Sequence, residues 1–175
     1  MNTPDITLRK TLTGRILDLG GGGEGVIGRV YGGQVTAIDT RQEELDEAPD
    51  GFEKVVMDAR QLTFDDATFD HVTAFFTMMY ISTSDHEQVL REAYRVLKPG
   101  SCLHIWDTVI ETAQSFVVQL DIDADGTPIH TGYGIHDEDA AQDTPWFEQL
   151  CEKVGFGHIT VEEMGPLFTL RAEKT

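Results

Sequence analysis

The residues that could do chemistry begin in the stretch LDLGGGGEGVIG, residues 17–28. Its glycines at positions 20, 22 and 25 spell G-x-G-x-x-G, the turn with which nicotinamide dinucleotides are bound at their pyrophosphate. Asp18 precedes this turn and Glu24 lies inside it. Both carboxylates would repel a pyrophosphate but attract an ammonium group or a positively charged sulfur. The loop therefore favours a ligand that carries positive charge.

Four aspartates each follow a short apolar run of strand length: Asp18, Asp39, Asp58 and Asp107. In an open parallel sheet, ligands bind beyond the carboxyl ends of the strands. A row of acids at that edge requires a ligand that is rich in hydrogen-bond donors or in positive charge.

Two of these aspartates match the parts of an adenosine. Asp39 lies about twenty residues after the glycine turn, where an acid can accept hydrogen bonds from both ribose hydroxyls. Asp58 could accept from the exocyclic amine of adenine while the N–H of Ala59 donates to a ring nitrogen. Each also has an ordinary structural interpretation, Asp39 as a helix N-cap or a solvated loop acid and Asp58 as an acid in a turn.

Strands that alternate with helices must position these residues. The apolar runs predict strands at 15–19, 34–38, 54–57, 70–75 and 103–106, and helices at 25–31, 41–48 and 85–97. Lys98-Pro99-Gly100 should end the last of these helices. Such alternation predicts a parallel sheet that is covered on both faces.

The pattern changes after residue 110. Residues 116–122 and 129–133 predict a hairpin around the turn ADGTP, residues 145–154 predict a helix, and 159–164 and 167–172 predict a closing pair of strands. Nothing in the composition indicates a linker, so we expect residues 1–175 to form a single domain.

Four segments occur in an order that is typical of a known family: ILDLGGGGEG (16–25), AIDT (37–40), VVMDARQLTFDDATFDHV (55–72) and LREAYRVLKPGSCLHI (90–105). Over residues 14–107 they resemble the successive motifs of class I S-adenosylmethionine (SAM)-dependent methyltransferases. The resemblance implies a Rossmann-like α/β fold with a seven-stranded, mostly parallel sheet and an antiparallel terminal strand. Residues 14–107 would be the SAM-binding core, the hairpin at 115–135, inserted after the fifth strand, a lid, and 144–175 the closing helix and strands.

The resemblance also assigns roles to individual residues. It assigns Asp18, Gly20 and Gly22 to the methionine part of SAM, Asp39 to the ribose, Asp58 and Ala59 to the adenine, Thr40 and Arg60 to the flanks of the adenosine, and Phe76 and Thr77 to the neighbourhood of the methyl group. Glu24 departs from the family pattern because it occupies the position of the third glycine. We therefore expect the loop to turn one residue later.

The acceptor side is less well defined by the sequence. Methyl transfer is an in-line displacement that depends on positioning, and a general base is needed only if the nucleophile arrives protonated. We rank Tyr80 first among the candidates, followed by Thr77, because Tyr80 occupies a position where many small-molecule relatives carry a histidine. Tyr133, His130 and His136 are further candidates. A half-buried aromatic that caps the sheet is the structural alternative for Tyr80.

Composition excludes several classes of function. The net charge is −18, with 31 acids against 13 bases, and this field disfavours nucleic acids and anionic membranes as partners. Cys102 and Cys151 have no metal-type spacing, which predicts reduced thiols and argues against arsenic methylation. His130, His136 and Asp137 are too irregularly spaced to predict a metal site.

The leading interpretation is a cytoplasmic enzyme that transfers a methyl group from SAM to a small-molecule acceptor, with no metal, and for which a homodimer is one assembly to consider. An NAD-dependent oxidoreductase would explain the glycines and Asp39, but not Asp18, Asp58 or RVLKPG. A non-catalytic SAM-binding protein on the same fold is the third reading. The N-terminus shows no secretory signal, and the apolar stretch at 72–81 is too short to span a bilayer.

Overall fold

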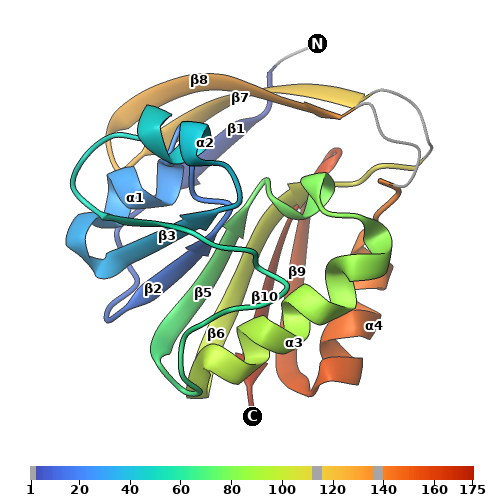
Figure 1. Cartoon of the computed structure of the whole chain (residues 1–175). Helices are drawn as coiled ribbons and strands as arrows, with labels where there is room; N and C mark the ends of the chain where they lie inside the picture. The colour runs from blue at the N-terminus through green and yellow to red at the C-terminus, as the bar shows by residue number, and fades with distance from the viewer. Residues whose placement is uncertain (1–2, 112–115, 136–139) are drawn as a thin grey trace.

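The structure, a computed structural model, describes residues 3–111, 116–135 and 140–175, and a seven-stranded sheet forms its centre (Figure 1). The strand order is β4-β3-β2-β5-β6-β10-β9. Only β10 runs against the others, because it pairs antiparallel with both β6 and β9 while the remaining neighbours are parallel. The bounds are Ile16–Leu19 (β2), Val35–Asp39 (β3), Glu53–Val56 (β4), Phe69–Phe75 (β5), Leu97–Thr108 (β6), Phe156–Met164 (β9) and Leu167–Lys174 (β10). The predicted Rossmann-like α/β sheet with an antiparallel terminal strand is confirmed.

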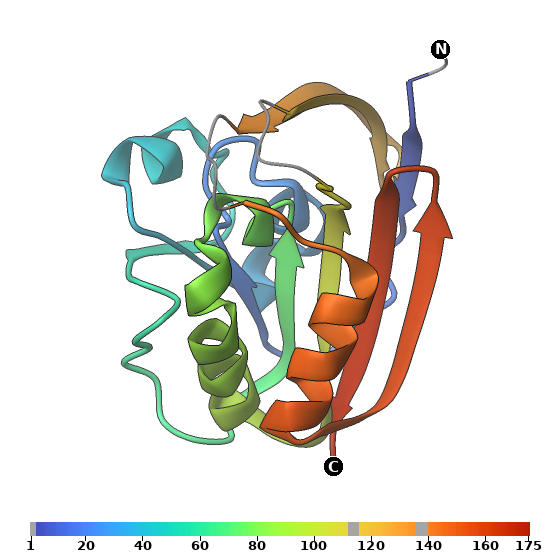
Figure 2. The same cartoon turned by 90° about the vertical axis from the view of Figure 1, so that its right-hand side faces the viewer.

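Two longer helices cover one face of the sheet. They are α3 (His86–Val96) and α4 (Thr144–Val154), which lie side by side in Figure 2. The apolar residues of α3 recur every three or four positions, and this spacing turns them all toward the sheet. The α4 helix begins where the Asp143 carboxylate accepts from the backbone N–H of Trp146 at 2.8 Å, and it ends before Gly155.

The second face carries α1 (Val26–Tyr31) and a separate three-stranded sheet, while the short α2 (Gln42–Glu47) contacts β3 and β4. The small sheet has the order β1-β7-β8, formed by Asp5–Leu8, Phe116–Ala124 and Thr127–Ile135. It lies above the carboxyl end of β5 in Figure 1. The predicted hairpin is confirmed, with Asp125 and Gly126 at positive φ in its turn. The sequence did not predict β1, which pairs parallel with β7.

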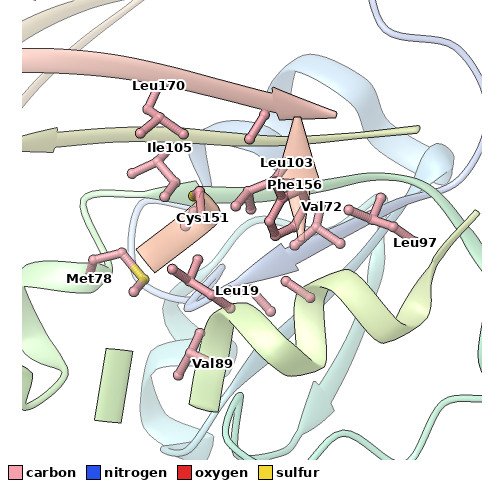
Figure 3. Packing of buried hydrophobic residues seen from close by; sticks show 14 of the residues in the cluster. Leu19, Val72, Met78, Val89, Leu97, Leu103, Ile105, Cys151, Phe156 and Leu170 are labelled. Atoms are coloured by element: carbon pink, nitrogen blue, oxygen red, sulfur yellow. The ribbon is translucent and has the colours of Figure 1, made fainter. Parts of the chain in front are cut away.

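Two hydrophobic clusters hold these layers together. One lies between the sheet and helices α3 and α4 and is drawn in Figure 3, where Leu19, Val89 and Cys151 point toward one another. The other joins α1 and the small sheet to the opposite face of the large sheet. All four residues of β2 are buried, as expected of a central parallel strand covered on both sides.

Several predicted boundaries differ by a few residues, and the largest difference is at the start of β6. The predicted strand spans residues 103–106, but β6 already begins at Leu97, so that Lys98-Pro99-Gly100 belongs to the strand. The helix α3 still ends at this point, at Val96. Short 3₁₀ turns complete the fold at Gly32–Gln34 (η1), Met78–Tyr80 (η2) and Thr83–Asp85 (η3). None of the helices in the described ranges is long and apolar enough to cross a membrane.

Candidate cofactor and acceptor site

A cavity of about 970 Å³ opens at the carboxyl ends of the parallel strands. This volume is near the upper end for small-molecule sites, so there is room for a cofactor and a second small molecule. We refer to its lining residues between 18 and 60 as the glycine-loop wall, and to its lining residues 75–85 and 131–133 as the hairpin wall. All eleven residues predicted for the site line this one cavity: Asp18, Gly20, Gly22, Asp39, Thr40, Asp58, Ala59, Arg60, Phe76, Thr77 and Tyr80.

The protein itself uses part of the hydrogen-bonding capacity of the glycine loop. The N–H of Gly21 donates to the carbonyl of Ile38 at 3.0 Å. The N–H of Gly23 donates to the carbonyl of Glu44 in α2 at 2.7 Å. A pyrophosphate binds through unpaired N–H groups at a helix start. The loop therefore offers fewer donors to a dinucleotide than its G-x-G-x-x-G spacing indicates.

The loop has left-handed glycines on both sides of Glu24, at Gly23 (φ 61°) and at Gly25. Gly25 adopts a left-handed conformation (φ 57°) directly before α1, and Glu24 has an ordinary φ. The backbone carbonyl of Glu24 accepts from Nε of Arg29 at 2.6 Å, and its carboxylate lies 3.7 Å from the same guanidinium. Glu24 thus borders the cavity as a partly neutralised acid.

Gly22 lies where the loop approaches α2 most closely. A Cβ atom at this position would be 2.6 Å from Cβ of Glu44 and 2.9 Å from Oδ2 of Asp39. No side chain fits in that space without moving α2 or the Asp39 carboxylate. The glycine is therefore required by close packing at the cavity wall.

Asp18 is a buried carboxylate at the base of the glycine-loop wall. Burial raises its pKa to about 7, a hydrogen bond from Oγ1 of Thr73 at 2.8 Å opposes this shift, and the charge of Asp39 adds to it. An unpaired buried charge is costly, so a cation placed against Asp18 would be bound strongly. This end of the cavity therefore favours a positively charged group of a ligand.

Asp39 and Asp58 are held with their carboxylates at the cavity. Oδ1 of Asp39 accepts from the N–H of Arg41 at 3.1 Å. Asp58 is bound to Arg60, with the shortest contact at 2.7 Å, and this hydrogen bond lowers the pKa of Asp58. A second contact of 3.0 Å joins Arg60 to Asp85. Arg60 therefore links the two walls of the cavity.

Phe76 and Thr77 form the turn that follows β5. Phe76 has a positive φ of 49°, which is rare for a bulky residue and is typical of functional sites. Its N–H donates to the carbonyl of Trp106 at 2.7 Å. The Thr77 hydroxyl donates to the carbonyl of Leu19 at 2.8 Å, which ties this turn to the glycine loop. Because its proton is engaged in this way, the Thr77 oxygen can act toward a ligand only as an acceptor.

The hairpin contributes an aromatic side chain to the cavity. The Tyr133 ring stacks on Phe76, with centroids 4.8 Å apart and planes inclined by 9°. The Tyr80 hydroxyl accepts from the N–H of Gly134 at 3.1 Å. The side chain of Tyr80 is otherwise 55% exposed, so this bond is its principal link to the hairpin. Tyr80 and Tyr133 thereby connect η2 to β8 over the cavity.

Two buried residues behind the hairpin wall, His86 and Asp107, hold η2 in place. His86 approaches the carbonyls of Met78 at 2.9 Å and Ile81 at 3.0 Å through Nε2, and its Nδ1 accepts from the indole N–H of Trp146 at 3.1 Å. Burial lowers the pKa of His86, so this histidine stays neutral. No pattern in the sequence indicates this role of His86, because the role depends on its contact with Trp146 of α4.

Asp107, the last of the four strand-end aspartates, does not line the described part of the cavity. Its carboxylate accepts from the N–H groups of Met79 at 3.3 Å and Thr108 at 2.8 Å and from the Gln142 amide at 2.8 Å. Burial raises its pKa to about 7. Asp107 therefore supports the turn that carries Tyr80.

Several other candidates lie elsewhere. His130 pairs with Asp121 on the exposed side of the hairpin, and His136 and Asp137 are outside the described residues. In the described ranges, no group of three or more His, Cys, Asp or Glu side chains could hold a metal ion. Cys102 and Cys151 are buried free thiols, as predicted.

The cavity is strongly acidic. Its described lining carries seven carboxylates and three arginines, and neither lysine nor histidine. Each arginine has a carboxylate partner on the lining: Arg29 with Glu24, Arg41 with Glu44, and Arg60 with Asp58 and Asp85. The formal charge of the lining is therefore four negative. Such a cavity attracts cations and repels phosphates and carboxylates.

A family model described as "Methyltransferase domain" matches residues 17–105, just over half of the chain. The match begins in β2 and ends in β6, so it spans the strands whose carboxyl ends form the cavity. The chain belongs to the methyltransferase domain family. The predicted family is thus confirmed, and with it SAM as the cofactor class that the family uses.

Solved methyltransferases share the fold at low sequence identity. A SAM-dependent methyltransferase from Thermotoga maritima, described as a possible histamine N-methyltransferase, is 18% identical with a TM-score of 0.69, covering 94% of this chain and 83% of its own. A SAM-dependent methyltransferase from Mesorhizobium loti has a TM-score of 0.67 at 18% identity, with coverages of 95% and 93%. A [4+2]-cyclase, SpnF, also reaches a TM-score of 0.67 at 19% identity, covering 95% of this chain and 78% of its own. These likenesses concern the fold alone.

Curated proteins that match this chain are named as methylases of a benzoquinol and of demethylmenaquinone. A mitochondrial 2-methoxy-6-polyprenyl-1,4-benzoquinol methylase from Leishmania donovani is 29% identical over 120 residues, covering 63% of this chain and 41% of that protein. A demethylmenaquinone methyltransferase from Listeria welshimeri is 50% identical over 50 residues, covering 29% of this chain and 20% of that protein. The chain therefore spans less than half the length of these relatives.

Proposed function

We propose that this protein transfers a methyl group from SAM to a small-molecule acceptor that binds in the cavity beneath the hairpin. The observation that carries the proposal is the acidic glycine-loop wall. It presents the separate carboxylates of Asp18, Asp39 and Asp58 to one cavity, while N–H groups of the loop are engaged by the protein. A cationic adenosyl ligand complements this arrangement better than a dinucleotide does.

The residues of the glycine-loop wall fit SAM from end to end. The Asp18 carboxylate would face the ammonium group, and Gly22, packed against α2, would line the space for the methionine part. Asp39 would accept from the ribose hydroxyls, with Thr40 beside them. Asp58 and Ala59 would bind the adenine, and Arg60 would hold Asp58 in position.

The hairpin wall would position the acceptor. SAM supplies an activated methyl group when bound, and the work of the protein is to align the nucleophile with it and exclude water. Phe76 and Tyr133 form a stacked aromatic surface, and Tyr80 ties the hairpin down over it. The Thr77 hydroxyl fixes this wall to the glycine loop by its bond to Leu19. The hairpin would then act as a lid.

The acceptor is not inferred from the relatives. The curated relatives are named for quinol and quinone substrates, but this chain spans only 41% of the first of them. The cyclase with the same fold demonstrates that the fold by itself does not define the reaction. The cytoplasmic location, the single-domain division and the homodimer remain predictions.

Calorimetric titration with SAM, S-adenosylhomocysteine and NAD tests the proposal. We expect both adenosyl ligands to bind and NAD to fail, because the pyrophosphate would face an acidic cavity. Binding of NAD without SAM would instead support an oxidoreductase. Transfer of a tritiated methyl group from SAM into a metabolite pool then separates an enzyme from a protein that only binds SAM.

A further inference from the structure

We propose that the methyl acceptor is an uncharged aromatic compound whose nucleophile is a ring nitrogen of the pyridine or imidazole type, and that methylation turns it into a cation. This inference rests on the proposed methyltransferase function and specifies the class of its second substrate.

The shape of the hairpin wall favours an aromatic ring. Its apolar lining residues are Phe75, Phe76, Tyr80, Ile81 and Tyr133, of which Phe75 and Phe76 are buried and Tyr80 is exposed. Tyr133 is stacked in parallel on the buried Phe76 ring, and this stack fixes the plane of the Tyr133 ring at the cavity. Planar rings pack well against such surfaces, where they bury a large apolar area.

The described residues of the hairpin wall include no lysine, no histidine and no unpaired carboxylate that could activate an acidic nucleophile. Neither lysine nor histidine belongs to the described lining. The Thr77 hydroxyl donates a hydrogen bond to the backbone carbonyl of Leu19, and the Asp85 carboxylate forms a salt bridge with Arg60. Burial raises the pKa of Tyr80, and the charges of Asp107 and Glu44 add to the shift, so this phenol stays protonated at neutral pH.

Tyr133 experiences the same environment. Burial raises its pKa most, and the neighbouring Tyr80 and the carboxylates of Glu24 and Asp18 raise it further. A phenol or quinol acceptor in this position would likewise keep its proton and remain a poor nucleophile. An alkylammonium group would also keep its proton, because negative surroundings favour its charged form.

A pyridine or imidazole nitrogen avoids both difficulties. It carries a free lone pair at neutral pH, so no base is needed for the attack. The lone pair forms the new N–C bond while the C–S bond breaks and its electron pair remains on sulfur. The positive charge passes from sulfur to nitrogen and is conserved. The four negative charges of the lining stabilise both the starting and the final cation.

Three probes of similar shape and different charge test this inference by binding alone. The protein is saturated with S-adenosylhomocysteine and titrated with 4-ethyl-1-methylpyridinium, with its uncharged isostere 4-ethyltoluene, and with the anion 4-ethylbenzoate. We expect the cation to bind at least about tenfold more tightly than 4-ethyltoluene, and the benzoate to bind most weakly. A cleft lined by negative charges attracts cations and repels anions. Equal binding of cation and isostere, stronger binding of the benzoate, or no binding of the cation overturns the inference.

A pair of variants locates the effect in the cavity. Glu24→Gln removes one lining carboxylate close to Tyr133 and should reduce the preference for the cation. Asp121→Asn removes a carboxylate of comparable exposure on the outer side of the hairpin and should leave that preference unchanged. An equal loss in both variants would indicate only the general charge of the protein and would contradict the inference.

The chemistry is tested in parallel with SAM and the acceptors 4-ethylpyridine and 4-ethylphenol. Tritium should enter the pyridine and not the phenol, and the opposite result overturns the inference. If SAM and S-adenosylhomocysteine do not bind at all, the proposed function fails instead. The two failures are therefore distinguishable.

Discussion

The glycine-loop wall and the hairpin wall meet in one cavity, but they depend on the chain in different ways. In the glycine-loop wall, Asp18 and Asp39 lie in the last two positions of their strands and Asp58 lies two residues beyond its strand, and parallel pairing brings those strand ends together. In the hairpin wall, Tyr80 and Gly134 are joined by a bond across 54 residues of sequence. The first wall is encoded by local motifs and the second by long-range contacts.

This difference separates the two tasks of the proposed enzyme. Substitutions in the glycine-loop wall should change the affinity for SAM. Substitutions in the hairpin wall should change how the acceptor is held while the affinity for SAM is kept. The following variants test this division, beginning with the largest expected effect.

Gly22→Ala should reduce the affinity for SAM about 100-fold. The added methyl group would lie 2.6 Å from Cβ of Glu44, so α2 or the Asp39 carboxylate must move, and displacements of this kind are costly in a positioned site. Calorimetric titration measures the loss. Gly33→Ala is the matched control, because its Cβ would meet nothing within 4 Å. An unchanged affinity in Gly22→Ala would show that the loop does not contact the cofactor.

Asp39→Ala should weaken the binding of SAM by about 2 kcal/mol, or about 30-fold in affinity, which is the scale of hydrogen bonds to a charged group. The same titration measures it. Asp46→Ala serves as the control, since Asp46 is an exposed acid of α2 that bonds to Gln42. If both variants bind SAM equally well, Asp39 does not bind the ribose.

The same difference explains what the sequence could predict. The strands and the hairpin follow from short apolar runs and turn residues, whereas several of the eleven lining residues follow only from the resemblance to the methyltransferase family. The short strand β1 was missed because the four residues DITL are too few to predict a strand by themselves. They form one by pairing with β7, more than 100 residues away. His86 was missed for a related reason, since its contact with Trp146 exists only after α4 has packed against α3.

Tyr133 was predicted only in part. The sequence named it among several acceptor candidates but gave no reason to prefer it over His130. The structure separates the two by strand alternation: Tyr133 faces the cavity and stacks on Phe76, whereas His130 is on the exposed side. The register of the hairpin decides this, and register is not visible in composition.

The affinity for SAM should fall about tenfold between pH 8 and pH 6, a smaller effect again. Burial raises the pKa of Asp18 to about 7, so this carboxylate is largely ionised at pH 8 and largely protonated at pH 6. Only the ionised form attracts the ammonium group. Titrations across this range measure the slope, and Asp18→Asn should bind SAM weakly and with little dependence on pH. A slope that persists in Asp18→Asn would assign the titration to another group.

Tyr80→Phe should have the smallest effect and act on the hairpin wall alone. It removes the oxygen that accepts from the N–H of Gly134, a loss of about 1 kcal/mol for a neutral hydrogen bond. Hydrogen exchange should show the amide of Gly134 about fivefold less protected, while the amides of Gly21 and Gly23 and the affinity for SAM stay unchanged.

Tyr94→Phe is the control for this last variant. Its hydroxyl donates to the carbonyl of Thr175 at 3.2 Å, at the chain terminus and away from the cavity lining, so its loss should leave the exchange of Gly134 unaltered. If Tyr80→Phe instead lowers the affinity for SAM as strongly as Asp39→Ala does, the two walls act as one unit. The division between cofactor and acceptor walls would then be wrong, because the bond between Tyr80 and Gly134 would be holding the glycine loop as well as the hairpin.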